Sequence, residues 1–416
     1  MRMYDQDERL TKNLMQHVNY LCSKEANGRL SGSNGIKKVA EYLSFELDKL
    51  GCLPSGTKGY FFPVPITVTE FSGPVKLKIG NLNLEYRKDF AEFNASPGGV
   101  LAGTLAIVRD GEDIAKESIT DKTVLIPEKP EKLDIGETTS AAAALGIKAL
   151  LIESGEPKWF SKEIWGKAKY AIPVIRINRR NIASLVKVEG SEVDLKLPFK
   201  TSYTECQNVL GILPGSNSAR NIVLSAHMDH LGDDPNGYRY PGAVDNASGV
   251  SIIMEVARMI SSRSSPLPFN VLIAFLTGEE LGVIGAKELL KNLSYRLDAA
   301  INVDMMGIDM DLKAVRLGNK EPGNWLTDLA SKVLENYSIE KKWTSGGDDS
   351  VAFISKGIPT LGLGEKTIDS KGPSIHNAED TIKRLNFKSL LKTSKIVYNI
   401  IEEIAEQPSV LESRIM

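Results

Sequence analysis

The feature that most constrains the fold is a regular alternation of strand-like and helix-like segments in the second half of the chain. After Cys206, four apolar runs of strand length are each followed by a run with helical spacing. The strand-like runs are NIVLSAHMD, FNVLIAFLT, AAINVDMMG and IPTLGLG. The runs that follow them are NASGVSIIMEVARMISS, VIGAKELLKNL, NWLTDLASKVLENY and NFKSLLKTSKIVYNIIEEIAE. This alternation predicts a three-layer α/β fold, in which a mainly parallel sheet is covered by helices on both faces.

The first 200 residues follow a different pattern. Residues 4–53 have the spacing of two helices around the turn NGRLSGSNG. Short β-prone runs such as VKLKIG, TLAIV and TVLIP come next, separated by Gly, Pro and Asn. We therefore predict that residues 1–65 and 201–416 form the α/β domain, and that residues 66–200 form a compact β-rich insert.

The composition argues against several classes of protein. The chain has 51 Lys and Arg against 53 Asp and Glu, so it lacks the basic excess of a nucleic-acid-binding domain. The most apolar run, residues 269–277, has strand length and is too short to span a membrane. The three cysteines, Cys22, Cys52 and Cys206, are too far apart in the sequence to indicate a disulfide framework or a metal cluster.

The N-terminal segment MRMYDQDERL has no apolar core of a signal peptide. The sequence as written therefore predicts a cytoplasmic protein. A secreted protein from which a signal had been removed would begin in the same way. The oligomeric state stays open at this point.

Polar residues gather where the predicted strands end. In open parallel sheets, ligands bind beyond the carboxyl ends of the strands, where the chain turns into the next helix. Three of the chain's four histidines lie in such segments. The side chains at these positions are His227, Asp229, His230, Asp245, Glu279, Glu280, Asp304 and His376.

Each of these residues also has a structural interpretation. Asp245 before a helix could be an N-cap, and an acidic pair after a strand is usually a solvated turn. His230 could lie beside a site or on the surface. Asp304 is harder to explain in this way, because a carboxylate in an apolar strand is costly unless it is paired or bound to a metal. Taken together, the histidines and carboxylates form a nitrogen and oxygen ligand set suited to zinc, cobalt or manganese.

The order of the site motifs resembles that of the co-catalytic di-zinc aminopeptidases. The motifs are H-x-D, V-D-N-A-S-G, G-E-E-x-G, D-M-M-G and I-H-N-A-E-D. The same superfamily contains glutamate carboxypeptidases, the transferrin receptor and animal glutaminyl cyclases. GRLSGSNG is similar to the start of these proteins, and the segments GTLAIVRDG, AAAALGIKALLI and IPVIRI resemble the protease-associated domain that many members carry as an insert.

The resemblance implies a zinc exopeptidase-like fold and a site for two zinc ions, with cobalt or manganese as other candidates. It implies that His227 and Asp304 hold one metal and that Glu280 and His376 hold the other. Asp245 would bridge the two metals.

The resemblance also implies roles for two further acids. Glu279 would be the general base, and Asp229 would orient the imidazole of His227, which lies two residues away on the same face of the strand. A cis peptide bond between Asp245 and Asn246 is a further implication.

The function implied by the resemblance is that of an aminopeptidase, which removes residues from peptides with a free N-terminus. Three alternatives stay open: a carboxypeptidase or dipeptidase of the same superfamily, a glutaminyl cyclase with one zinc, and a non-catalytic peptide-binding relative. The segment TSGGDDSVAF departs from the Ser-Asp-His form common in the family. Asp348 or Asp349 could orient a group near the metals, or both could belong to a solvated acidic turn.

Overall fold

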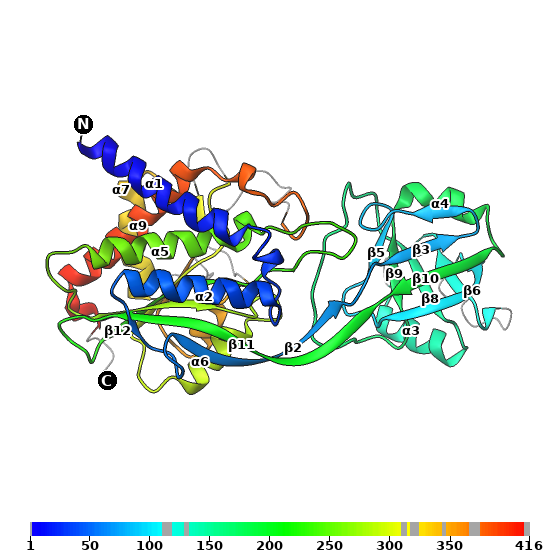
Figure 1. Ribbon diagram of the computed structural model, residues 1–416, viewed down its shortest axis with the longest axis horizontal. Coiled ribbons are helices and arrows are strands. Elements are labelled where there is room, and N and C mark those ends of the chain that lie inside the picture. The colour runs from blue at the N-terminus through cyan, green and yellow to red at the C-terminus, as the bar shows by residue number, and fades with distance from the viewer. Residues whose placement is uncertain are drawn as a thin grey trace. The chain divides into compact units, whose positions relative to one another are not determined.

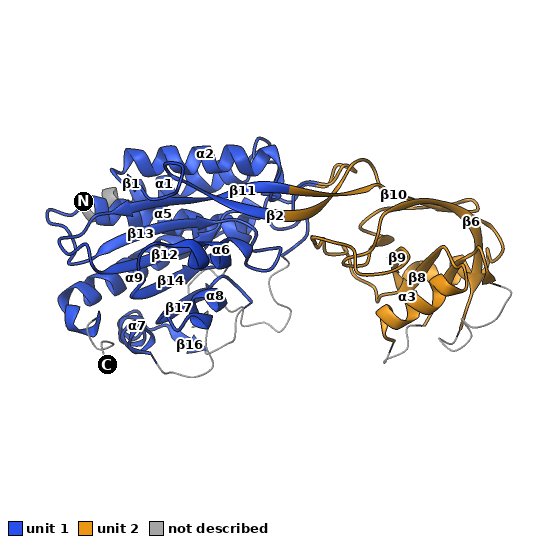
Figure 2. Ribbon diagram, turned by 90° about the horizontal axis from the view of Figure 1, so that it is seen from below, with its two compact units in different colours: residues 1–66, 204–233, 239–416 blue, residues 67–203, 234–238 orange. Residues whose placement is uncertain are grey.

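The chain folds into two compact units (Figure 2). Unit 1 comprises Met1–Ile66, Thr204–Asp233 and Arg239–Met416, and unit 2 comprises Thr67–Tyr203 and Asp234–Tyr238. The computed structural model describes residues 2–109, 119–128, 133–308, 314–316, 324–342, 347–365 and 375–411. The identity of unit 2 as a protease-associated domain stays a prediction.

Four parallel strands form the centre of the sheet in unit 1. They are β12 (Asn221–His227), β13 (Asn270–Leu276), β14 (Ala299–Val303) and β17 (Thr360–Glu365). In the sheet they lie in the order β13-β12-β14-β17, and all their residues are buried. Burial on both faces explains why their sequences are almost continuously apolar rather than alternating. The prediction of a mainly parallel α/β sheet is confirmed.

Further strands extend this sheet on both sides. β11 (Phe199–Leu213) runs antiparallel to β13 and also pairs with β1 (Leu53–Pro54) and β2 (Phe61–Phe71). On the other side, β15 (Ala314–Arg316) pairs with β17 and with β16 (Glu340–Lys342).

Most of the described helices of unit 1 fall into two packed groups. In one group, α5 (Ser248–Ser261) contacts both α1 (Arg2–Leu21) and α9 (Phe387–Glu406), and α9 also contacts α7 (Trp325–Asn336) (Figure 1). In the other group, α6 (Ile284–Asn292) contacts α8 (Ser350–Ser355). The remaining helix, α2 (Asn34–Lys49), is capped by Ser33, whose side chain accepts a hydrogen bond from the backbone N–H of Ile36.

Unit 2 contains an eight-stranded sheet in the order β4-β3-β10-β6-β7-β8-β9-β5. Its strands are β3 (Lys76–Ile79), β4 (Leu82–Leu84), β5 (Phe90–Glu92), β6 (Gly99–Ile107), β7 (Thr123–Ile126), β8 (Ala149–Glu153), β9 (Val174–Ile177) and β10 (Glu192–Leu197). Its helices are α3 (Ile135–Ala144) and α4 (Arg179–Val186). Exposed and buried residues alternate along β10, as expected for a strand with one face on the core.

Unit 2 also holds a buried ionic cluster. The carboxylate of Asp234 lies 2.9 Å from Nε of Arg87 and 2.7 Å from Nζ of Lys162, and all three side chains are almost inaccessible to water. Such a cluster is stable only when each charge has a partner, so it fixes residues 234–238 within this unit.

No helix in the described parts of the chain is long and apolar enough to cross a membrane.

His17 on α1 gives a test of the helical packing that depends on pH. Its side chain is fully buried, with Nδ1 2.7 Å from the hydroxyl of Tyr42, and burial lowers its pKa to about 4. The unfolded state then takes up a proton below about pH 6.5, while the folded state does not, so stability falls as the pH falls towards 4. Between pH 7 and pH 4, we expect the free energy of unfolding of His17→Gln to fall by about 3 kcal/mol less than that of the wild type. Urea denaturation of both proteins across this range measures the difference, and parallel curves would contradict the burial of a neutral imidazole.

Candidate metal centre

Most of the predicted site residues follow the carboxyl ends of three neighbouring parallel strands. His227 is the last residue of β12, Asp304 comes directly after β14, and Glu279 and Glu280 follow shortly after β13. Because these strands are parallel and adjacent, their carboxyl ends meet at one edge of the sheet. The topology therefore brings together residues that lie far apart in the sequence.

Asp245 lies in a short helical turn, Ala243–Ala247, that precedes α5. The peptide bond between Asp245 and Asn246 is cis, as the resemblance implies. The N-cap position of α5 is occupied by Ala247, and the Asp245 side chain is turned towards the histidines instead. The interpretation of Asp245 as a helix cap is therefore wrong.

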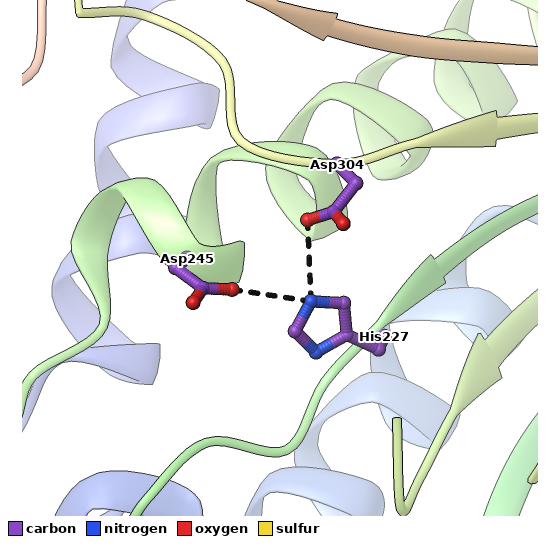
Figure 3. A group of neighbouring side chains, drawn as sticks. All are labelled: His227, Asp245 and Asp304. Carbon is purple, nitrogen blue, oxygen red and sulfur yellow. Dashed lines mark hydrogen bonds and ion pairs between the residues drawn. The ribbon is translucent and has the colours of Figure 1, made fainter. Parts of the chain in front are cut away.

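His227, Asp245 and Asp304 form a first group of possible ligands (Figure 3). Nε2 of His227 lies 3.2 Å from Oδ1 of Asp245 and 3.2 Å from Oδ1 of Asp304. All three side chains are buried, and one ligand atom from each lies within 4.8 Å of the others. One imidazole nitrogen and two carboxylate oxygens at this spacing suit a divalent cation such as zinc.

A second group shares Asp245. Nε2 of His376 lies 3.2 Å from Oδ2 of Asp245 and 3.2 Å from Oε2 of Glu280. Asp245 thus presents Oδ1 to one group and Oδ2 to the other. This is the arrangement that a carboxylate needs to bridge two cations.

His230 belongs to this second group. Its side chain is fully buried, and Nδ1 lies 2.8 Å from Oε1 of Glu280 and 3.9 Å from Oδ2 of Asp245. A surface position for His230 is therefore excluded. The sequence motif HMDH indicated a position for His230 near the site, because it puts a second histidine just beyond the strand end that carries His227.

Asp229 is fully buried behind His227. Its Oδ1 lies 3.7 Å from Nδ1 of His227, a distance for an ion pair rather than a hydrogen bond. Two donors hold the carboxylate in place: the hydroxyl of Ser31 at 3.1 Å and the backbone N–H of Glu279 at 3.3 Å. Its role as the residue that orients His227 stays a prediction.

The crowding of carboxylates sets the pKa values of the site. Burial by itself would raise the pKa of Asp245, but hydrogen bonds from His227 and His376 hold it well below its usual range. Burial would lower the pKa of His376, whereas the charges of Glu280 and Asp245 raise it to about 11. Protonated imidazoles therefore balance the carboxylates here, a task that a bound divalent cation would also perform.

The pKa of Glu279 is shifted in the opposite direction to that of Asp245. Burial raises its pKa well above the usual range, and the neighbouring carboxylates of Asp304 and Glu280 add to this effect. Its side chain is not a member of either ligand group. A carboxyl group with a raised pKa beside a metal centre is suited to taking up and releasing a proton.

Asp348 and Asp349 lie at the start of α8, and both are buried. The solvated acidic turn is therefore excluded. Asp348 accepts hydrogen bonds from the side-chain amide of Asn302 at 3.3 Å and from the backbone N–H of Ser350 at 2.9 Å. Burial raises the pKa of Asp349 well above its usual range, and the carboxylates of Asp229 and Asp304 reinforce the shift.

Comparison with known proteins agrees with this geometry. Residues 208–401 match the family model described as peptidase family M28. We refer to these matched residues as the M28 segment. The M28 segment contains every residue of the two ligand groups and also Glu279.

Two curated proteins illustrate the similarity. A probable leucine aminopeptidase of Trichophyton verrucosum is 26% identical over 248 residues, which cover 53% of this chain and 61% of that protein. Aminopeptidase YwaD of Bacillus subtilis is 26% identical over 287 residues, which cover 65% of this chain and 60% of that protein. The chain thus spans about three-fifths of the length of these curated relatives.

Solved structures of two aminopeptidases share the fold over most of the chain. BSAP, a zinc aminopeptidase from Bacillus subtilis, superposes with a TM-score of 0.75 at 21% identity and covers 94% of this chain and 95% of its own. An aminopeptidase from Aneurinibacillus sp. strain AM-1 gives a TM-score of 0.67 at 22% identity, with 96% of both chains covered. At this level of identity the comparison establishes the fold.

The shared position of Asp245 predicts how metal addition changes stability. A ligand that binds only the folded state stabilises it by about 2.7 kcal/mol at 100 times its Kd, so Zn²⁺ should raise Tm relative to EDTA. Asp245→Asn weakens both groups and should remove most of this rise. The control variant Asp328→Asn, at an exposed position, should keep the rise in Tm. Thermal unfolding with Zn²⁺ and with EDTA makes the comparison, and an equal rise in Asp245→Asn would show that Asp245 is not shared.

Proposed function

We propose that the protein is a metal-dependent aminopeptidase that removes residues from the free N-terminus of peptides. The observation that carries the proposal is the position of Asp245, whose two carboxylate oxygens face two separate groups of nitrogen and oxygen ligands. The M28 match and the names of the curated relatives, leucine aminopeptidase and aminopeptidase YwaD, support the same activity.

The residues of the site fit two divalent cations, with zinc the first candidate and cobalt or manganese the others. His227 and Asp304 would hold one cation, and Glu280 and His376 the other, with Asp245 shared. When bound, such a pair lowers the pKa of a water molecule and polarises the scissile carbonyl group.

Glu279 is the proposed proton carrier of the reaction. It would take a proton from the attacking water and give it to the departing amine. Burial and the neighbouring carboxylates raise its pKa, and a carboxylate with a raised pKa is a stronger base. Asp229 would keep His227 in place, and Ser31 and the Glu279 backbone in turn hold Asp229.

A carboxypeptidase is the less favoured alternative, because the curated relatives are named as aminopeptidases.

We also propose that unit 2 is a protease-associated domain. The support is the resemblance of GTLAIVRDG and IPVIRI, which begin within β6 and lead into β9, to segments of that domain.

Glu279→Gln tests the role of the proton carrier. The amide cannot accept the proton, so we expect kcat to fall by about 10²–10⁴ while the metal content and Tm stay close to the wild type. Glu340→Gln, at an exposed position on β16, is the matched control and should keep full activity. An unchanged kcat in Glu279→Gln would remove Glu279 from this role.

A substrate panel tests the activity itself. We expect hydrolysis of aminoacyl chromogenic substrates with a free α-amine, none of their N-acylated forms, and loss of activity with a chelator. Metal analysis of the same preparation should give two divalent ions per chain. Hydrolysis of the acylated forms would contradict exopeptidase action from the N-terminus, and a folded protein without metal or activity would favour the peptide-binding alternative.

A further inference from the structure

The turn that connects α1 to α2 carries a fully buried arginine, Arg29. Each of its five N–H groups donates to a backbone carbonyl oxygen. Nε donates to Met228 at 2.9 Å, Nη1 to Pro241 at 2.6 Å and Leu21 at 2.8 Å, and Nη2 to Gly242 at 2.9 Å and Asp245 at 3.3 Å. All five donors of the guanidinium therefore bind backbone carbonyl groups.

The carbonyl groups bound by Arg29 belong to the segments that carry the ligands. Met228 follows His227 directly at the end of β12. Pro241 and Gly242 lead into the turn that contains Asp245, and the carbonyl of Asp245 itself is the fifth acceptor. One rigid, planar group thus bridges the strand end with His227 and the loop with Asp245.

Backbone contacts around Arg29 reinforce this link. The N–H of His230 donates to the carbonyl of Arg29 at 3.1 Å, and the N–H of Gly232 donates to that of Gly28 at 2.7 Å. Gly28 has a φ of +65°, and a Cβ atom there would lie 2.6 Å from the backbone carbon of Gly232. The turn therefore approaches the segment after β12 as closely as backbone atoms allow.

Ser31, two residues further on, contacts the third ligand-bearing segment. Its hydroxyl group donates to Oδ2 of Asp229 at 3.1 Å and accepts from the backbone N–H of Gly278 at 3.1 Å. Gly278 precedes Glu279 and Glu280. The turn is thereby bonded to the residues that follow His227, to the loop with Asp245 and to the start of the acidic pair.

We propose that the turn of residues 27–33 is a clamp that positions the metal ligands, with Arg29 and Ser31 as its positioning residues. The clamp lies outside the M28 segment, residues 208–401, although it binds backbone that carries that segment's ligands. It rests on the proposed function only in that the site holds divalent cations.

Arg29 is suited to this role by its geometry. A buried cation with backbone partners alone is stable only when all its donors are satisfied, and arginine supplies five donors in a fixed plane. Lysine has three donors on a single atom and cannot reach carbonyl groups on both segments at once. Arg29→Lys therefore keeps the charge and removes the link.

Titration with Co²⁺ measures the effect of Arg29→Lys directly, since both the affinity and the visible absorption spectrum report on the ligands. We expect Arg29→Lys to bind Co²⁺ about 10–100-fold more weakly than the wild type, with an altered spectrum, in protein shown to be folded by circular dichroism. The matched control is Arg296→Lys, at a position where the side chain is 58% exposed, and it should bind as the wild type does.

Ser31→Ala removes only the hydroxyl group that contacts Asp229 and Gly278. It tests the clamp independently of Arg29, and it still does so if the Arg29→Lys protein does not fold. We expect weaker Co²⁺ binding than in the wild type, while the exposed Ser262→Ala should leave it unchanged. A role in stability alone would lower Tm in these variants but leave the affinity and spectrum of the folded protein unchanged.

The outcomes separate the clamp from the proposed function. Wild-type affinity and spectrum in a folded Arg29→Lys or Ser31→Ala overturn the clamp and leave the peptidase proposal in place. A wild-type protein that binds no Co²⁺ overturns the peptidase proposal and the clamp with it.

Discussion

The structure depends on the burial of several carboxylates at one edge of a parallel sheet. An ionised carboxylate is costly to remove from water unless it is paired. Asp245, Asp304 and Glu280 are each buried beside a histidine at 2.8–3.2 Å, and the histidine charges offset part of this cost. Divalent cations would offset it in place of the histidine protons, because a histidine binds a metal in its neutral form.

This electrostatic requirement explains the backbone around the site. Carboxylates can be shared between two cations only if the segments that carry them are held at fixed distances, and loops alone are too mobile for that. Three of these segments begin at the ends of strands fixed by the sheet, while the loop with Asp245 has no strand of its own. Arg29 bonds that loop to the end of β12. The carboxylate of Asp380 adds a second constraint, because it accepts hydrogen bonds from the backbone N–H groups of Val244 and Asp245.

Much of the site could be predicted from the sequence, but for different reasons at different residues. The polar residues that interrupt apolar runs, such as Asp304 after AAINV, signalled a ligand because burial without a partner would be costly. His230, by contrast, was ambiguous, since a histidine just past a strand end can point to solvent as easily as to the site. Arg29 could not be assigned at all, because its partners are backbone carbonyl groups, which leave no mark in the sequence.

The sequence by itself determined the parallel α/β fold, because strand and helix periodicity and continuous apolar strands reflect burial that is local to each element. It also determined which residue types stand at the strand ends. Only the tertiary structure decided which oxygen of Asp245 faces which histidine, that Asp348 and Asp349 are buried, and that an N-terminal turn reaches the loop more than 200 residues away. Those features arise from contacts between distant segments, and such contacts are fixed by packing rather than by the pattern of any one segment.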